Sequence, residues 1–171
     1  MSNYAVIRTD LMSGTKQPAD MVSLRFYEAV TADGQTTYVA KDVENGVIAK
    51  LLGYEDGERE IYRAVAATSS DDLNDCVVIA TPEVMYDERK RNLDDFINEA
   101  GRVSRGYILR SRNIFSLTAP GFVTVPEKGD KIAIGANGKL TKSTTGGFGI
   151  CADVETNGRY TYHAVRIGET E

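Results

Sequence analysis

The sequence predicts a mainly β protein of the α+β class with one main helix. Several stretches alternate apolar and polar residues with a period of two, which is typical of half-buried strands. Dipeptides that contain glycine and favour tight turns separate these stretches. Only residues 92–100 place apolar side chains at helical spacing. We therefore expect a compact body resembling a β-barrel or sandwich, with an N-terminal extended arm and a C-terminal β-hairpin unit.

The expected arm covers residues 1–20. Gly14 and Pro18 interrupt it, and Tyr4 to Arg8 are long enough only for a short strand. The segment buries little by itself, yet it is too apolar for a spacer, because it contains Tyr4, Val6, Ile7, Leu11 and Met12. Two interpretations stay open: the arm contacts a partner molecule, or it packs on its own body as an edge strand.

Residues 21–118 form the expected β-rich body. Residues 22–30 alternate, the turn "ADGQ" follows at 32–35, and residues 36–41 complete a hairpin. Residues 59–68 predict another strand. The run "CVVIAT" at 76–81 is continuously apolar, so it predicts a strand in the core.

The expected helix lies near residues 92–100. Asn92 is a favourable N-cap, and carboxylates follow it in the first turn, where they suit the helix dipole. Gly101 is placed to end the helix. We expect the stripe of Leu93, Phe96 and Ile97 to face the core.

Residues 119–171 form the expected C-terminal unit, which includes the stretch "GDKIAIGANGKLTK". A phosphate-binding loop would need a glycine at Ala133 and a serine or threonine at Leu140, so this interpretation is not favoured. The dipeptide Asn137-Gly138 between alternating strands predicts a β-hairpin with a type I′ turn. Asn157-Gly158 predicts a second turn, before a last strand at 159–167.

Composition is that of an ordinary globular protein: 171 residues, 42% apolar, 26% charged and a net charge of −5. The acidic balance speaks against a general nucleic-acid binder, which would normally be basic. No apolar run reaches the length of a membrane span, and no signal-peptide pattern opens the chain. We therefore expect no membrane partner and synthesis in a cytosol. Cys76 and Cys151 lie in apolar strands and are expected to be buried, reduced thiols.

The sequence offers no set of residues for catalysis. His163 is the one histidine, and it lies in an alternating strand without the ligands of a zinc site. The paired acids at 71–72 and 94–95 are explained by solvation and by capping. We therefore expect no enzyme, no catalytic residue, no metal site and no cofactor.

A basic stretch follows the expected helix. Residues 101–118 carry Arg102, Arg105, Arg110 and Arg112 and no acid, whereas residues 28–58 hold seven acids against two lysines. The two regions are expected to pair within the fold, or else to face neighbouring molecules. Because Tyr107 and Phe115 are interleaved with the arginines, a nucleic-acid-binding β-barrel is the alternative function.

The last part of the chain carries a family resemblance. Residues 125–167, "VPEKGDKIAIGANGKLTKSTTGGFGICADVETNGRYTYHAVRI", have a K-G-D start, an alternating strand, a glycine turn into K-L, a Gly-Ile pair and a closing V-R-I strand. This segment resembles the end of head decoration, or capsid cement, proteins of tailed bacteriophages. The middle, "TPEVMYDERKRNLDDFINEAGRVSRGY", and the opening "VIRTDLMSGT" resemble phage structural proteins found beside the major capsid protein.

The resemblance implies a structural virion protein without enzymatic activity or cofactor. It implies assembly in the host cytoplasm and binding to the outer face of the phage capsid, where the protein stabilises the head against the pressure of the packaged DNA. The implied partners are the major capsid protein and, as a further option, copies of the protein itself in a trimer at threefold lattice positions. The expected partner contacts are Tyr4, Ile7, Arg8, Leu11, Met12, Lys16, Arg102, Arg105, Arg110 and Arg112.

Overall fold

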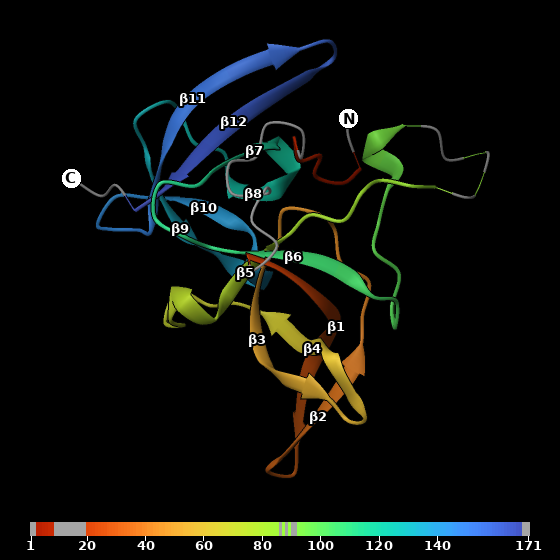
Figure 1. Cartoon of the computed structure of the whole chain (residues 1–171). Coiled ribbons are helices and arrows are strands. Elements are labelled where there is room, and N and C mark those ends of the chain that lie inside the picture. The colour runs from red at the N-terminus through yellow and green to blue at the C-terminus, as the bar shows by residue number, and fades with distance from the viewer. Residues whose placement is uncertain (1–2, 9–19, 86, 88, 90–91, 169–171) are drawn as a thin grey trace.

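A computed structural model describes residues 3–8, 20–85, 87, 89 and 92–168, and these residues form two β-sheets of six strands each (Figure 1). The prediction of a mainly β protein is confirmed. Within the described residues, helical structure is limited to short 3-10 turns, which include Leu73–Asp75, Leu93–Asp95, Ala119–Gly121 and Ala136–Gly138. None of the described helical segments is long or apolar enough to cross a membrane.

The first sheet has the strand order β2-β1-β4-β3-β5-β6. An additional antiparallel pairing between β1 and β6 closes five of its strands into a barrel, and β2 remains outside it. The pairing of β1 with β4 is parallel, and the other pairings are antiparallel. The strands are β1 (Met21–Ala32), β2 (Gln35–Ala40), β3 (Ile48–Glu55), β4 (Glu58–Ala66), β5 (Cys76–Ile79) and β6 (Ser104–Ile108).

The second sheet has the order β7-β12-β11-β9-β10-β8. Its first strand, β7, belongs to residues 21–118, which were expected to form the body, but it pairs with β12 of the C-terminal unit. The strands are β7 (Ile114–Thr118), β8 (Phe122–Thr124), β9 (Lys131–Ile134), β10 (Leu140–Ser143), β11 (Gly149–Asn157) and β12 (Tyr160–Ile167).

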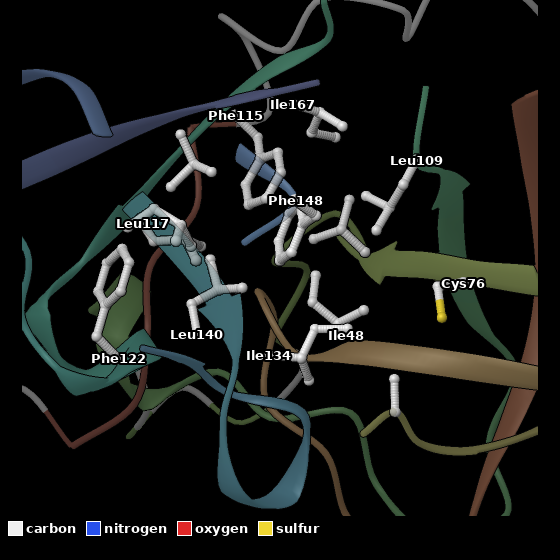
Figure 2. Packing of buried hydrophobic residues seen from close by; sticks show 14 of the residues in the cluster. Ile48, Cys76, Leu109, Phe115, Leu117, Phe122, Ile134, Leu140, Phe148 and Ile167 are labelled. Carbon is white, nitrogen blue, oxygen red and sulfur yellow. The ribbon is translucent and has the colours of Figure 1, made fainter. Parts of the chain in front are cut away.

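Two apolar cores hold the molecule together. One fills the barrel and includes Ala49, Val77 and Ile79. The other lies between the barrel and the second sheet, where Ile48 lies beside Ile134 of the second sheet and Cys76 belongs to the same cluster (Figure 2). Strands β3 and β5 contribute to both cores, because alternate residues point to opposite faces. All four residues of β5 are buried, which confirms the core strand predicted from "CVVIAT".

The expected hairpins are present. Asp33 and Gly34 join β1 to β2 with φ values of 53° and 77°. In the β9–β10 hairpin, Asn137 and Gly138 have φ values of 55° and 73°, as both central residues of a type I′ turn require. The turn after β11 begins one residue later than expected, since Asn157 still pairs with Tyr160.

The prediction of a helix at residues 92–100 is wrong. After the 3-10 turn Leu93–Asp95, Phe96 is extended, with ψ of 133°. Asn98 then pairs with Val43, and each backbone N–H donates to the other's carbonyl at 2.9 Å. This long-range pairing satisfies the groups that a helix would have satisfied. Phe96 is buried as expected, but Leu93 is 41% exposed and does not face the core.

Both cysteines are free and buried, as the sequence predicted. Burial raises the pKa of each thiol, Cys76 and Cys151, to about 11. Thiols of this kind are protonated at neutral pH and are poor nucleophiles. They serve as small apolar side chains of the core between the sheets.

Two features project from the body at opposite ends. The β1–β2 and β3–β4 hairpins extend from the barrel at one end, and the β11–β12 ribbon extends from the second sheet at the other (Figure 1). In both projections the distal residues of the strands are exposed. The molecule therefore offers surfaces that a partner can reach without entering a cleft.

Candidate interaction surfaces

The described part of the N-terminal segment lies on the chain's own body. Ala5 N–H donates to the Glu44 carboxylate at 2.9 Å, and Val6 N–H donates to the Thr118 hydroxyl at 2.9 Å. Ile7 pairs with Leu117 of β7 and is 3% exposed. Residues 5–8 therefore cover the edge of the second sheet, and the side chain of Ile7 belongs to the core rather than to a contact surface.

Other expected contact residues of this segment keep some exposure. Tyr4 and Arg8 are half-buried, and the Arg8 guanidinium carbon lies 5.4 Å from the centre of the Tyr162 ring. Such an arrangement is a cation–π contact within the molecule. The remaining expected contacts of the arm, Leu11, Met12 and Lys16, lie outside the described residues.

The four arginines of the basic stretch are not gathered into one platform. Arg102 precedes β6 and Arg110 follows it. Each residue of a strand adds about 3.3 Å, so these two arginines lie at opposite ends of β6. Arg102 pairs with Glu99 at 3.0 Å, and Arg110 pairs with the buried carboxylate of Asp20. Arg105 lies within β6, and Arg112 occupies a turn with φ of 72°.

Five of the seven acids of residues 28–58 pair with cations outside the basic stretch. Glu28 contacts Lys41 and Glu58 contacts Arg25, at 2.6 and 2.8 Å. The two aromatic residues that could have formed a stacking surface are unsuited to it. Phe115 is 2% exposed, and Tyr107 packs against the core between the sheets. The described ion pairs therefore do not join the acidic segment, residues 28–58, to the basic stretch.

A groove that the sequence did not reveal lies beside the basic stretch. Its volume is about 580 Å³, and it runs between residues 81–85 and 87 on one side and residues 95–104 on the other. Phe96, Ile97 and Met85 give it apolar walls, while Val84 and Val103 line it with 60% and 46% exposure. Its charged lining consists of Asp87, Asp95, Glu99 and Arg102, so carboxylates predominate. Of the expected contact residues, Arg102 is the one that lines this groove.

Two buried amides hold the walls of the groove in place. The Asn45 side chain receives a bond from Thr81 N–H at 3.0 Å and donates to Thr81 O at 2.8 Å. The Asn98 amide donates to Val43 O and to Asn45 Oδ1 at 3.0 and 3.1 Å. Because these amides are 1% and 5% exposed, their hydrogen bonds are shielded from water and fix the chain at Thr81 and Asn98, one position on each wall of the groove.

Exposed apolar side chains also lie on the strands at the far end of the barrel. Val30, Tyr38 and Val39 belong to the β1–β2 hairpin, and Leu52 and Tyr54 belong to β3. Each is at least 41% exposed. Tyr38 and Val39 are adjacent in β2 and point to opposite faces of the sheet, so these side chains do not form one continuous patch, and scattered exposed apolar side chains are common on proteins.

His163 lies in the middle of β12 and is 7% exposed. Its ring meets Phe122 edge-on at 5.5 Å, and burial lowers its pKa. A neutral imidazole in this apolar setting is a packed core residue. Across the described part of the chain, no group of three or more His, Cys, Asp or Glu residues is placed to hold a metal ion.

Comparisons with known proteins give few matches. No family model matches the chain, and no curated protein matches it. A solved structure that is similar to this chain is the head fiber gp8.5 N base of bacteriophage phi29. The two share 12% identity over 88% of this chain and 97% of that one, with a TM-score of 0.42.

Proposed function

We propose that this chain is a structural protein of a tailed-phage virion, which binds the outer surface of the head and stabilises the capsid. Its partner is the major capsid protein, and its action is binding rather than catalysis. Copies of the chain at threefold lattice positions are the further partner that the family resemblance implies. The proposal places the protein on the capsid surface, after assembly in the host cytoplasm.

The observation that carries the proposal is the placement of the segment that resembles decoration proteins. Residues 125–167 contain β9, β10, β11 and β12, which are neighbours in one sheet. The turn, the strands and the closing V-R-I that carry the resemblance belong to a single structural unit, which supports treating the resemblance as one feature.

The groove beside residues 95–104 is the proposed contact with the capsid. Its apolar walls suit an apolar side chain of a capsid segment. Among the described ion pairs, Asp87 pairs with Arg89 and Glu99 with Arg102, so Asp95 is the carboxylate of the groove that favours a basic group of the partner. The contact area of one groove is modest. Repetition on a lattice makes modest contacts sufficient, because neighbouring sites hold the partner in place.

The test is co-sedimentation of the purified chain with expanded, empty heads of the phage that encodes it. We expect saturable pelleting of the wild type. Val103→Lys brings a positive charge into the groove and is expected to weaken binding about tenfold, since a like charge opposes a basic partner. Val123→Lys is the matched control, because Val123 is similarly exposed but lies in β8, away from the groove.

Each outcome of this experiment has one meaning. Wild-type protein that stays in the supernatant at saturating concentration contradicts the proposed function. If Val103→Lys and Val123→Lys reduce binding equally, the proposed function stands but the groove is not the contact. Strong binding to single-stranded nucleic acid that falls steeply with salt would favour the alternative function instead.

A further inference from the structure

Strand β2 presents an open edge to solvent. All six residues of Gln35–Ala40 are exposed, and β2 is the outer strand of the first sheet. In the part of the chain that the structure describes, β1 is the one strand that pairs with it. The strand reads QTTYVA and carries no charge and no proline, and its pairing with β1 has no bulge, so the usual protections of an exposed edge are missing.

The hydrogen-bonding pattern shows which groups are free. Lys41 N–H donates to Phe26 O, so this pair and every second pair after it bond across the hairpin. Val39, Thr37 and Gln35 therefore direct their backbone groups toward β1. The alternate residues, Thr36, Tyr38 and Ala40, direct their N–H and C=O groups outward, where a further strand would bond to them.

Other exposed edges of the described molecule are covered, short or charged. Residues 5–8 cover β7, and β8 has three residues. The distal part of β11 carries Asp153 and Glu155, and the tip of the β3–β4 hairpin carries several acids. The opposite edge of β1 borders a groove that Glu28, Asp42, Glu44 and Lys139 line. The neutral edge of β2 differs from all of these.

We propose that β2 pairs antiparallel with β2 of a second copy of this chain, centred on Thr37. This arrangement places Thr36 opposite Tyr38 of the other copy, so the outward groups of both strands bond to each other. It also places the Asp33 end of one strand beside the Lys41 end of the other, whereas a parallel pair would bring like charges together. The strand itself is neutral, so nothing along it repels an identical strand.

The shape of the molecule leaves room for this contact. The β1–β2 hairpin projects beyond the barrel (Figure 1), so two copies meet through their hairpins while their bodies stay apart. A two-stranded ribbon is marginally stable alone, and pairing turns two ribbons into one four-stranded sheet. The association concerns the isolated protein and does not depend on binding to a capsid.

The first test is a charge exchange at Thr37, measured by sedimentation velocity over a range of concentrations. At the two-fold centre, Thr37 faces its own copy in a pair that brings side chains close. Thr37→Glu alone and Thr37→Lys alone are each expected to weaken dimerisation several-fold, and an equimolar mixture is expected to restore it. A mixture that associates no better than either variant overturns the proposal, as does association that neither variant weakens.

The second test removes an outward N–H. Tyr38→Pro deletes a donor that does not bond to β1, once in each copy, and is expected to weaken association about tenfold relative to Tyr38→Ala, which keeps the donor. Circular dichroism and the thermal midpoint check that both variants fold. Equal association of the two variants overturns the proposal. Wild-type protein that stays monomeric up to about 1 mM, the range of weak specific contacts, also overturns it.

Discussion

Gly138→Ala tests how the second sheet is fixed to the barrel. The turn of the β9–β10 hairpin reaches β3, so a Cβ added to Gly138 would lie 2.3 Å from the Ile48 carbonyl oxygen. It would also lie 3.0 Å from a methyl carbon of Val47. The φ of Gly138 is +73°, a conformation that costs a residue with a Cβ additional energy.

The magnitude follows from two contributions. The left-handed backbone costs alanine about 1 kcal/mol relative to glycine. The clash is with a backbone oxygen that accepts a bond from Ala67 N–H at 3.0 Å, so relief requires movement of β3. Forcing extra volume into a packed site costs about 1–3 kcal/mol. We therefore expect Gly138→Ala to lower the free energy of unfolding by about 2–4 kcal/mol.

Urea unfolding followed by circular dichroism measures this loss. Gly57→Ala is the matched control, because Gly57 has a φ of +81° in a turn and its added Cβ would meet nothing within 4 Å. The control carries the conformational cost alone, about 1 kcal/mol. Equal losses in the two variants would refute the close approach of the hairpin to β3.

Three further variants test burial and charge. Phe96→Ala should cost about 3 kcal/mol in urea unfolding, because the ring is 9% exposed although no helix carries it; an unchanged midpoint contradicts this placement. Asp71→Asn should lower stability at neutral pH. The Lys50 ammonium holds the pKa of Asp71 below its usual range, so its contribution is present above about pH 4 and is lost as pH falls through the folded pKa. The difference from wild type in pH-dependent melts should therefore shrink toward low pH, and a constant difference contradicts the ion pair. Arg110→Ala should cost about 1–2 kcal/mol by removing the cation bonded to the Asp20 carboxylate, which is 4% exposed, and Asp20→Asn in the same chain should recover part of this loss; the Arg110 side chain is itself 56% exposed, so water screens part of the pair.

The sequence predicted those elements whose cause is local. Asp33-Gly34 and Asn137-Gly138 form the turns expected of them, because the positive φ values depend on these residues themselves. The alternation of residues 131–134 also appears as alternating burial. Local chemistry and tertiary structure agree at these places, so a single sequence contains enough information.

The expected helix shows where local information is insufficient. Asn92 and Asp95 form a capping arrangement, as the sequence suggested, but it caps one 3-10 turn. The next residues are extended because Asn98 pairs with Val43, which lies 55 residues earlier in the chain. Helix propensity is a weak preference, and a buried long-range hydrogen-bond network outweighs it.

The candidate surfaces were harder to predict than the strands. The groove forms because Asn45, 36 residues before Thr81, fixes one wall while Asn98 fixes the other. Ile7 was expected on a surface, but its neighbour Val6 bonds to Thr118, 112 residues later, and the segment enters the core. Apolar content alone does not distinguish a contact residue from a core residue when the partner strand is distant in sequence.

The sharing of β3 and β5 between two cores leads to a last prediction, on cooperativity. Ile48 packs toward the second sheet, while its neighbour Ala49 faces the barrel interior. Loss of the second sheet would therefore expose one face of two barrel strands, and loss of the barrel would remove the surface on which the second sheet packs. We expect one calorimetric transition, with equal calorimetric and van't Hoff enthalpies. Ile48→Ala should lower this transition as a whole without splitting it. Two separate transitions, one of them unchanged by Ile48→Ala, would contradict the argument, because they would mean that each sheet keeps its structure without the core between them.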